Sequence, residues 1–427
     1  MFKNYIGPEA IINKKKEHLY PCTNHFYKNP PQLVRGEMQY LYDQKGNQYL
    51  DFFAGVSVVN CGHCNPIILE ATITQLKQLQ HTTTIYLSQP MVELAEKLAS
   101  VLPGNIKHSF FCTSGSEANE GALLLARLYT GRQSFIALEG SLHGRTHLTA
   151  SGTGIDMWRT DPYMDDSFHF IPNIAAFDEP PEKAAKLSIK ALKKLLKEKG
   201  KDIAAMIIEP IQGNGGIITP PLNYFQDIQK LLHKYGILLI VDEVQTGFAR
   251  TGKMFAIEHY QVIPDIITMA KALGNGIPIS AFCTNPTIAN AFNKPSASTL
   301  GGNQVACETA LAVLKYIDEN HLCQRTQELG TTLHQGLLKL KDKYPILKEV
   351  RGIGLMLGAE LIKKDGTPAT NETDTILETL KDNGIILGKN GIHRNVLAFQ
   401  PPLIITQRDI KNLLNQLDSA LKQVSFN

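Results

Sequence analysis

The sequence of 427 residues has little of several features that would point to particular classes of protein. Its 7 cysteines are few and scattered, which is typical of a reducing compartment and not of a disulfide framework. Lys and Arg total 43 against 40 Asp and Glu, and the formal net charge of +3 provides no basic surface for nucleic acid or an anionic membrane. A small-molecule partner is therefore favoured.

Long hydrophobic runs are also missing. The purest apolar run, at 237–241, has the length of a strand, whereas a membrane span needs about 18 to 20 apolar residues. The beginning of the chain, MFKNYIGPEAIINKKKEHLYPC, has no apolar central segment of the kind that an exported precursor carries. We expect a soluble, cytoplasmic protein.

From about residue 90 to 310, short apolar runs alternate with longer helical patterns. This alternation is typical of a mainly parallel sheet covered by helices. The segment 183–199 has apolar residues at three- and four-residue intervals and lysines on its other face, and 121–129 is a second expected helix. The expected strands are 108–112, 134–138, 204–208, 237–241, 266–269 and 279–283.

The two ends of the chain have a different pattern. The N-terminal end predicts a β-hairpin that turns at 45–47, and the C-terminal end predicts an amphipathic helix, a strand-like stretch at 354–361 and a closing helix from Gln407. We expect both ends to pair into one smaller α+β domain. Its segments are 1–65 and 312–427, and the large domain is 66–311.

Two of the expected strands end in groups that can perform chemistry. The run ILLIVDEVQTG ends in Asp242 and Glu243, and PDIITMAK ends in Lys271 beside a Gly-rich turn. Ligands bind at the carboxyl ends of strands in open α/β sheets, where a partly desolvated amine can act as a nucleophile. Pyridoxal phosphate requires such a pair, namely a Schiff-base lysine and an acid that keeps the pyridine nitrogen protonated. Taken singly, an acid that caps a turn and an exposed lysine remain ordinary alternatives.

The segment FFCTSGSEANE leads from a strand through a small-residue turn towards the helix expected at 121–129. Free backbone N–H groups at such a helix start, with hydroxyls and Gly115, form a cradle for an anion, although ordinary helix capping gives a similar pattern. The sequence lacks the P-loop lysine pattern and a spaced-glycine dinucleotide fingerprint after a strand. A nucleotide cofactor is therefore disfavoured.

Six motifs in a fixed order make the sequence similar to a known family. They are TSGSEANE, SLHGRT, IIEPIQGNGG, LLIVDEVQTGFARTGKMFA, PDIITMAKALGNGIP and STLGGN. Together they resemble the class III (omega-amino acid) aminotransferases, which include 4-aminobutyrate, acetylornithine, ornithine and alanine-glyoxylate enzymes, and the resemblance covers nearly the whole chain. It implies the type I pyridoxal phosphate transferase fold, an α/β fold with a mainly parallel central sheet and a smaller α+β domain. It also implies a homodimer, with a dimer of dimers left open.

The resemblance assigns roles around the ring of pyridoxal 5'-phosphate. Lys271 would form the Schiff base and move the substrate proton, and Asp242 would pair with the pyridinium nitrogen. Gln245 would contact the phenolic oxygen, while Val244 packs on one ring face. Leu142 stands where many members have an aromatic residue, so apolar packing would replace stacking on the other face.

The resemblance also assigns the phosphate contacts. Ser114, Gly115 and Ser116 would hold the phosphate from one subunit. Thr299 of the STLGGN motif would reach the same phosphate from the neighbouring subunit. A dimer would then be required for full cofactor binding.

The substrate residues contain one departure from the family. Arg145 would bind a substrate carboxylate, with a structural ion pair as the alternative, and Glu209 would gate a second arginine. Many members have that arginine before the C-terminal Pro-Pro-Leu, but this chain has Ala398. Losing a bidentate carboxylate clamp costs at least a few kcal/mol, so pyruvate or glyoxylate is favoured over 2-oxoglutarate as the acceptor. The donor would be an amino acid, with ω-amino acids such as 4-aminobutyrate or β-alanine included, in a ping-pong reaction.

Two alternatives remain open. An amino acid racemase or epimerase of the same fold would use the same lysine and aspartate. The motif CGHC, with Cys61 and Cys64, has the spacing of a thiol–disulfide oxidoreductase, and with His63 it could bind a metal. Its flanking residues match the aminotransferase pattern, so we favour a structural turn there and expect no metal site.

Overall fold

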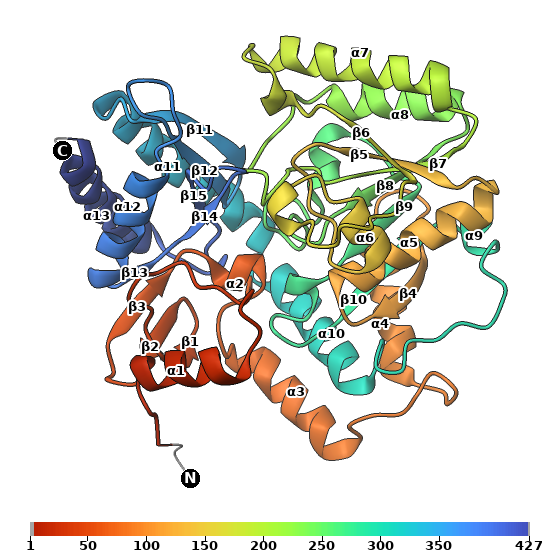
Figure 1. The fold of residues 1–427 in the computed structure, drawn as a ribbon. Helices are drawn as coiled ribbons and strands as arrows, with labels where there is room; N and C mark the ends of the chain where they lie inside the picture. The colour runs from red at the N-terminus through yellow and green to blue at the C-terminus, as the bar shows by residue number, and fades with distance from the viewer. Residues whose placement is uncertain (1–3, 426–427) are drawn as a thin grey trace.

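The computed structural model describes residues 4–425. Its centre is a seven-stranded sheet in the order β4-β10-β9-β8-β7-β5-β6, in which β10 alone runs antiparallel to its neighbours (Figure 1). The six strands expected from sequence are confirmed, and each of their ends lies within one residue of its expected position. The strands are β4 His108–Cys112, β5 Ser134–Leu138, β6 Phe168–Ile171, β7 Ile203–Ile208, β8 Leu238–Asp242, β9 Ile266–Met269 and β10 Ser280–Thr284.

Sequence reasoning missed β6, the edge strand beside β5. This strand has four residues, and the middle two are only half-buried because one side of an edge strand has no neighbour. It therefore lacks the continuous apolar run that identifies a central parallel strand.

Helices cover both faces of this sheet. Alternate strand residues point to opposite faces, so Ile240 packs in a cluster with α5, whereas Leu239 and Val241 pack in the larger cluster that includes α7, α8 and α10. The expected helix at 183–199 is confirmed as α7, and its lysines face away from the core. The helices of this part are α3 Pro66–Gln78, α4 Gln89–Val101, α5 Gly115–Thr130, α6 His147–Ser151, α7 Pro181–Lys199, α8 Tyr224–Lys234, α9 Pro286–Ala289 and α10 Gln304–Glu319, with 3-10 helices η1 Asp156–Trp158, η2 Ile174–Ala176, η3 Ala256–Tyr260 and η4 Lys271–Leu273.

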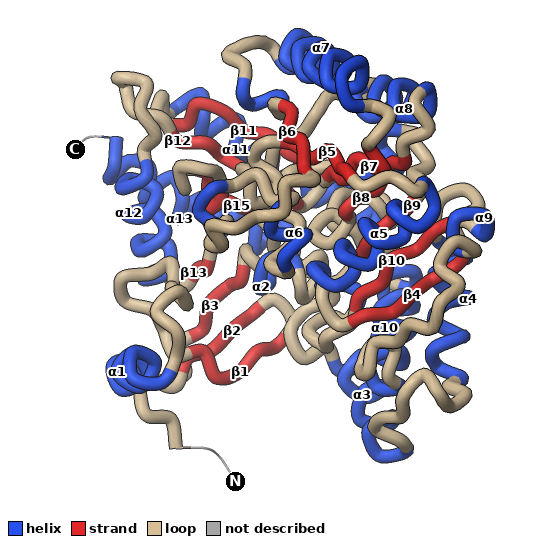
Figure 2. Tube along the Cα trace, turned by 45° about the vertical axis from the view of Figure 1, so that its right-hand side comes forward, coloured by secondary structure: helices blue, strands red, loops and turns tan. Residues whose placement is uncertain are grey.

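The two ends of the chain meet in a separate four-stranded sheet, β1-β2-β3-β13 (Figure 2). The expected hairpin is confirmed as β2 and β3, and β13 from the C-terminal end pairs with β3 in parallel through Ile385 and Leu50. The strands are β1 Leu33–Glu37, β2 Tyr40–Asp43, β3 Gln48–Asp51 and β13 Ile385–Ile386. The expected boundary after residue 311 falls within α10, which continues through it.

A third sheet, of order β11-β12-β15-β14, belongs to the C-terminal end alone. Its strands are β11 Leu347–Ile353, β12 Met356–Leu361, β14 Gly388–Asn390 and β15 Val396–Phe399. The helices beside these two sheets are α1 Pro8–His18, the short turn α2 Ala54–Ser57, α11 Leu322–Lys343, α12 Thr370–Asp382 and α13 Gln407–Ser425. Within residues 4–425, none of the helices is long and apolar enough to cross a membrane.

A fully buried arginine joins both ends of the chain to the central sheet. Arg250, from the loop after β8, donates from Nη1 to the carbonyls of Leu355 at 3.0 Å and Pro401 at 2.6 Å. Its Nη2 contacts the side-chain oxygen of Asn60. Because buried carbonyls need donors, this guanidinium fixes the N-terminal and C-terminal segments beside the loop that follows β8.

Candidate active site

The carboxyl ends of β8 and β9 bring Asp242 and Lys271 to one cavity. Asp242 is the last residue of β8 and pairs in register with Thr268 of β9, and Lys271 lies two residues after the last residue of β9. The cavity has a volume of about 350 Å³ and is also lined by the start of α5 and by the loop before α6. The expected site residues that line it are Ser114, Gly115, Ser116, Leu142, Glu209, Asp242, Val244, Gln245 and Lys271.

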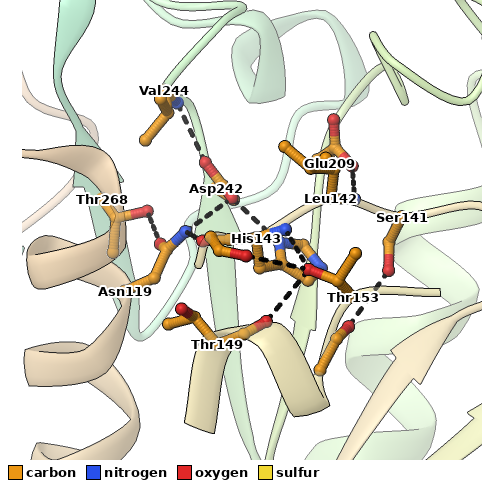
Figure 3. A network of polar contacts seen from close by, with 12 residues as sticks. Asn119, Ser141, Leu142, His143, Thr149, Thr153, Glu209, Asp242, Val244 and Thr268 are labelled. Carbon is orange, nitrogen blue, oxygen red and sulfur yellow. Dashed lines mark hydrogen bonds and ion pairs between the residues drawn. The ribbon is translucent and has the colours of Figure 1, made fainter. Parts of the chain in front are cut away.

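Asp242 is held by three hydrogen bonds (Figure 3). Its Oδ2 accepts from Asn119 Nδ2 and from His143 Nδ1, both at 2.8 Å, and its Oδ1 accepts from the backbone N–H of Val244 at 3.0 Å. A carboxylate offers about four acceptor sites, so Oδ2 is fully used and one site of Oδ1 remains for another donor. The position of Asp242 is therefore fixed before any ligand binds.

The neighbouring acid, Glu243, has different surroundings and does not line the cavity. It is completely buried, where it accepts from the backbone N–H of Ile257 at 2.7 Å and contacts the hydroxyl of Thr246. Burial raises the pKa of Glu243 to about 7. Of the two carboxylates at the end of β8, only Asp242 is placed for ligand chemistry.

Lys271 has a backbone φ of 47°, in the left-handed region that few non-glycine residues adopt. Such conformations persist where the surrounding structure imposes them, and they cluster at functional sites. Burial lowers the pKa of the Lys271 amine to about 8, although the negative charges of Asp242 and Glu209 act in the opposite direction. A large part of the amine is then in its neutral, nucleophilic form in mildly alkaline solution.

The first turn of α5 forms the opposite wall of the cavity. The helix begins at Gly115, so the expectation that 115–120 precede the helix in a turn is wrong. The reason is that Ser114 acts as N-cap and accepts from the backbone N–H of Glu117 at 3.2 Å. A Cβ atom on Gly115 would lie 2.9 Å from Val244 Cγ1, so glycine allows these two segments to approach. The remaining free N–H groups of the first turn suit an anion.

Glu209 and Gln245 complete the cavity beside Lys271. Glu209 accepts from the backbone N–H groups of Leu142 at 2.9 Å and Gly213 at 3.1 Å, and its burial raises the pKa of the carboxyl group. Gln245 Oε1 accepts from Gln400 Nε2 of the C-terminal segment at 3.2 Å. A side chain on Gly213 would place Cβ only 2.3 Å from Gln245 Oε1, so it would displace the amide of Gln245.

The family model described as Aminotransferase class-III matches residues 24–421. The chain belongs to the class-III aminotransferases. It is 42% identical to the alanine–glyoxylate aminotransferase 2 homolog 2, mitochondrial, of Arabidopsis thaliana, over 98% of this chain and 89% of that protein. It is 39% identical to the acetylornithine aminotransferase of Methanocaldococcus jannaschii, over 96% and 97% of the two chains. The crystal structure of a transaminase from the marine bacterium Virgibacillus has a TM-score of 0.90 and 30% identity, covering 97% of this chain and 99% of its own.

The aminotransferase depends on pyridoxal phosphate and transfers an amino group between an amino acid and an oxo acid. The expected fold, an α/β type I pyridoxal phosphate transferase with a mainly parallel central sheet, is confirmed. The relatives give no support to the alternative of a racemase or epimerase.

The cavity of the aminotransferase fits this cofactor. The start of α5 offers N–H groups and the hydroxyls of Ser114 and Ser116 to a phosphate, without a side chain at Gly115. Asp242 Oδ1 keeps an acceptor site for a protonated ring nitrogen, and the Lys271 amine lines the same cavity. These are the donors and acceptors that the cofactor requires.

The pKa of Lys271 predicts a pH dependence in the aminotransferase freed of cofactor. The neutral amine fraction increases with pH, so the rate at which an aldehyde attaches to Lys271 should rise about tenfold from pH 7 to 9 and then level off, because the pKa is about 8. The measurement is borohydride trapping followed by peptide mass spectrometry, with the exposed Lys253 as internal control. Labelling of Lys271 that follows Lys253 at every pH would contradict the lowered pKa.

Two expected site residues lie outside the cavity of this chain. Arg145 is exposed, and its backbone N–H donates to Ser116 Oγ at 3.1 Å. Thr299 is also exposed, in the loop between α9 and α10. The single chain therefore brings the other expected site residues together but leaves these two at its surface.

Sequence reasoning missed three residues that surround Asp242, namely Asn119, His143 and Thr268. Asn119 belongs to the TSGSEANE motif and His143 to SLHGRT, and both line the cavity. Their place in these motifs indicates a functional role. No local sequence pattern pairs either residue with Asp242, which lies about a hundred or more positions away.

Ala398 lies in an apolar cluster with Ile211, Ile217 and Met356, and it is completely buried. The partly buried side chains of Phe53 and Ile353 pack against this cluster. The position where many family members have an arginine is therefore occupied by packed apolar side chains.

The CGHC segment has the features of a structural turn. Cys61 is buried and Cys64 is exposed, and burial raises the pKa of the Cys61 thiol, whereas a reactive thiol needs a lowered pKa. His63 Nε2 pairs with Asp51 Oδ2 at 2.7 Å. In the described part of the chain, residues 4–425, no group of three or more His, Cys, Asp or Glu side chains is arranged to hold a metal ion. Neither the redox nor the metal alternative gains support.

Proposed function

We propose that this aminotransferase passes an amino group from an amino acid, ω-amino acids included, to a small oxo acid such as pyruvate or glyoxylate. The observation that carries the choice of acceptor is Ala398, because the side chains packed around it are apolar where a cation would bind the second carboxylate of 2-oxoglutarate. The likeness to a protein named alanine–glyoxylate aminotransferase supports a small acceptor as well.

We propose that residues on both sides of the cavity hold the cofactor. Ser114, Gly115 and Ser116 bind the phosphate at the start of α5. On the opposite side, Asp242 accepts a hydrogen bond from the protonated ring nitrogen at the free site of Oδ1. When bound, pyridoxal phosphate supplies an electron sink for the pair released as a bond to the substrate carbon breaks.

Three further side chains would orient the ring within the cavity. Gln245 is proposed to bind the phenolic oxygen, since Gln400 already fixes its side chain. Val244 and Leu142 would contact the two faces, and both line the cavity. Their apolar surfaces would exclude water from the reacting atoms.

Lys271 is the proposed base. Its neutral Nζ takes a proton from the substrate carbon and returns it one step later, which requires an amine whose pKa lies near the working pH. Burial among the cavity residues lowers the pKa of the Lys271 amine towards that pH. Asp242 serves this step by keeping the ring nitrogen protonated.

Arg145 and Glu209 are the proposed substrate contacts. The exposed guanidinium of Arg145 would bind a carboxylate at the entrance, next to Ser116. Glu209 faces the cavity with both oxygens bound to backbone N–H groups. Because Ala398 replaces the arginine that this acid gates in relatives, we propose that Glu209 here only shapes the pocket.

We propose a homodimer in which Thr299 of one subunit contacts the cofactor phosphate of the other. Thr299 is exposed, and Leu300 beside it leaves 53% of its surface exposed. Ile85, Tyr86 and Leu87 are also strongly exposed, in a segment that Gln304 ties to this loop through Thr82. An apolar surface of this kind favours contact with a second copy.

We also propose that the enzyme works in the cytoplasm. The seven cysteines are free thiols, which persist in a reducing compartment.

A panel of amino donors tests the proposed reaction. β-Alanine and 4-aminobutyrate would each be paired with pyruvate, glyoxylate and 2-oxoglutarate, and L-alanine with glyoxylate and 2-oxoglutarate. Oxo-acid formation is measured for every pair, and loss of optical activity for the chiral donor L-alanine. We expect pyruvate or glyoxylate to exceed 2-oxoglutarate in kcat/KM by at least about tenfold, which is about 1.4 kcal/mol of lost carboxylate binding. Equal use of 2-oxoglutarate would refute the acceptor assignment, and racemisation without oxo-acid formation would refute transamination.

A further inference from the structure

Asn119 connects the two ends of the proposed cofactor site. It lies on α5 four residues after Gly115, which places both on the same side of the helix. Its side chain is 1% exposed, and Nδ2 donates to Asp242 Oδ2 at 2.8 Å and to the carbonyl of His143 at 2.7 Å (Figure 3). One rigid helix therefore carries both the anion cradle and a donor to the carboxylate.

Thr268 holds the amide oxygen of Asn119. Its buried hydroxyl donates to Asn119 Oδ1 at 2.6 Å (Figure 3). Because the carboxylate of Asp242 and the carbonyl of His143 can only accept, Nδ2 must face them, and Oδ1 is left to face Thr268. Thr268 is also the register partner of Asp242, so the three residues join β8, β9 and α5.

We propose that Asn119, held at its amide oxygen by Thr268, is a positioning residue for Asp242. With His143 it occupies both acceptor sites of Oδ2, so that the carboxylate can rotate only by losing a hydrogen bond in a buried site. The free acceptor site of Oδ1 then stays at a fixed distance from the start of α5. This inference rests on the proposed cofactor contacts, since it assigns the ring nitrogen to that acceptor site.

Variants at Thr268 separate positioning from packing. Thr268→Val keeps the shape of the side chain but removes the hydroxyl, so the buried amide oxygen of Asn119 loses its hydrogen-bond donor. Thr268→Ser restores the hydroxyl with less packing. Asn119→Leu removes the donor itself at similar volume.

Each variant would be prepared as holoenzyme with ¹⁵N-labelled pyridoxal phosphate. The readouts are kcat, the cofactor dissociation constant and the ¹⁵N chemical shift of the ring nitrogen, which reports its protonation. We expect Thr268→Val and Asn119→Leu to lower kcat by about 10- to 100-fold, by analogy with the loss found when the hydrogen-bond partner of a metal ligand is removed. Their ring ¹⁵N shift should move towards the unprotonated value, and Thr268→Ser should rescue both properties.

Three results would overturn the proposal. The first is a ring ¹⁵N shift and kcat in Thr268→Val and Asn119→Leu that match the wild type. The second is a Thr268→Ser variant as impaired as Thr268→Val, because packing would then explain the loss. The third is failure of both disruptive variants to fold while Thr268→Ser folds, because the pair would then be structural. A wild-type protein that neither binds the cofactor nor transfers an amino group would instead refute the proposed function.

Discussion

Replacement of Lys271 by alanine is expected to abolish turnover. Alanine provides neither an amine that can bond to the cofactor nor a base for the substrate proton. Proton transfer by a positioned base contributes about 10²- to 10⁴-fold by itself, so a loss of at least about 10⁴-fold in kcat is expected when the bond is lost too. The measurement is oxo-acid formation with excess donor and acceptor, together with the visible absorption of the purified holoenzyme.

The matched control for this variant is Lys253→Ala. Lys253 is an exposed lysine on the loop after β8 and lies outside the cavity. It should keep both the activity and the absorption of the wild type. Sustained multiple turnover by Lys271→Ala would show that another group carries the chemistry.

Replacement of Asp242 by asparagine is expected to retain the cofactor and lower kcat by at least about 100-fold, or about 2.7 kcal/mol. An amide is neutral and cannot hold a proton on the ring nitrogen. It also offers one acceptor oxygen where the carboxylate offers two, so Asn119, His143 or Val244 must lose a hydrogen bond. The measurement is single-turnover kinetics at saturating donor, with bound cofactor quantified in the same sample.

Glu243→Gln is the matched control for Asp242→Asn, because both replace a buried carboxyl group at the end of β8, or next to it, by its amide. Burial already raises the pKa of Glu243 to about 7, so a neutral side chain is compatible with its surroundings. This variant should keep the rate of the chemical step. If the two variants lost activity equally, the special position of Asp242 would be refuted.

The central sheet could be predicted from the sequence because buried parallel strands are continuous apolar runs. The same reasoning placed Asp242 and Lys271 together, since the carboxyl ends of neighbouring parallel strands lie side by side. β6 was missed because an edge strand is only partly buried. The start of α5 was placed too late because the small residues after Ser114 resemble a turn, although Ser114 caps a helix there.

The hydrogen bonds around Asp242 could not be predicted. Asn119 is 123 positions and His143 99 positions away from Asp242 in the sequence, and no local pattern encodes such pairs. The hydrogen bonds of the buried Arg250 could not be predicted either, since its partners Leu355 and Pro401 are 105 and 151 positions away. Such contacts depend on how the elements pack, which periodicity does not describe.

The identity of the lysine that carries the cofactor tests the account most directly. The wild-type holoenzyme would be reduced with borohydride, digested, and mapped by mass spectrometry for the peptide that retains the cofactor. The account predicts that the cofactor is found on Lys271, in one equivalent per chain. Attachment to a different lysine would contradict it. So would a fully loaded and active enzyme in which borohydride fixes the cofactor to none of the lysines.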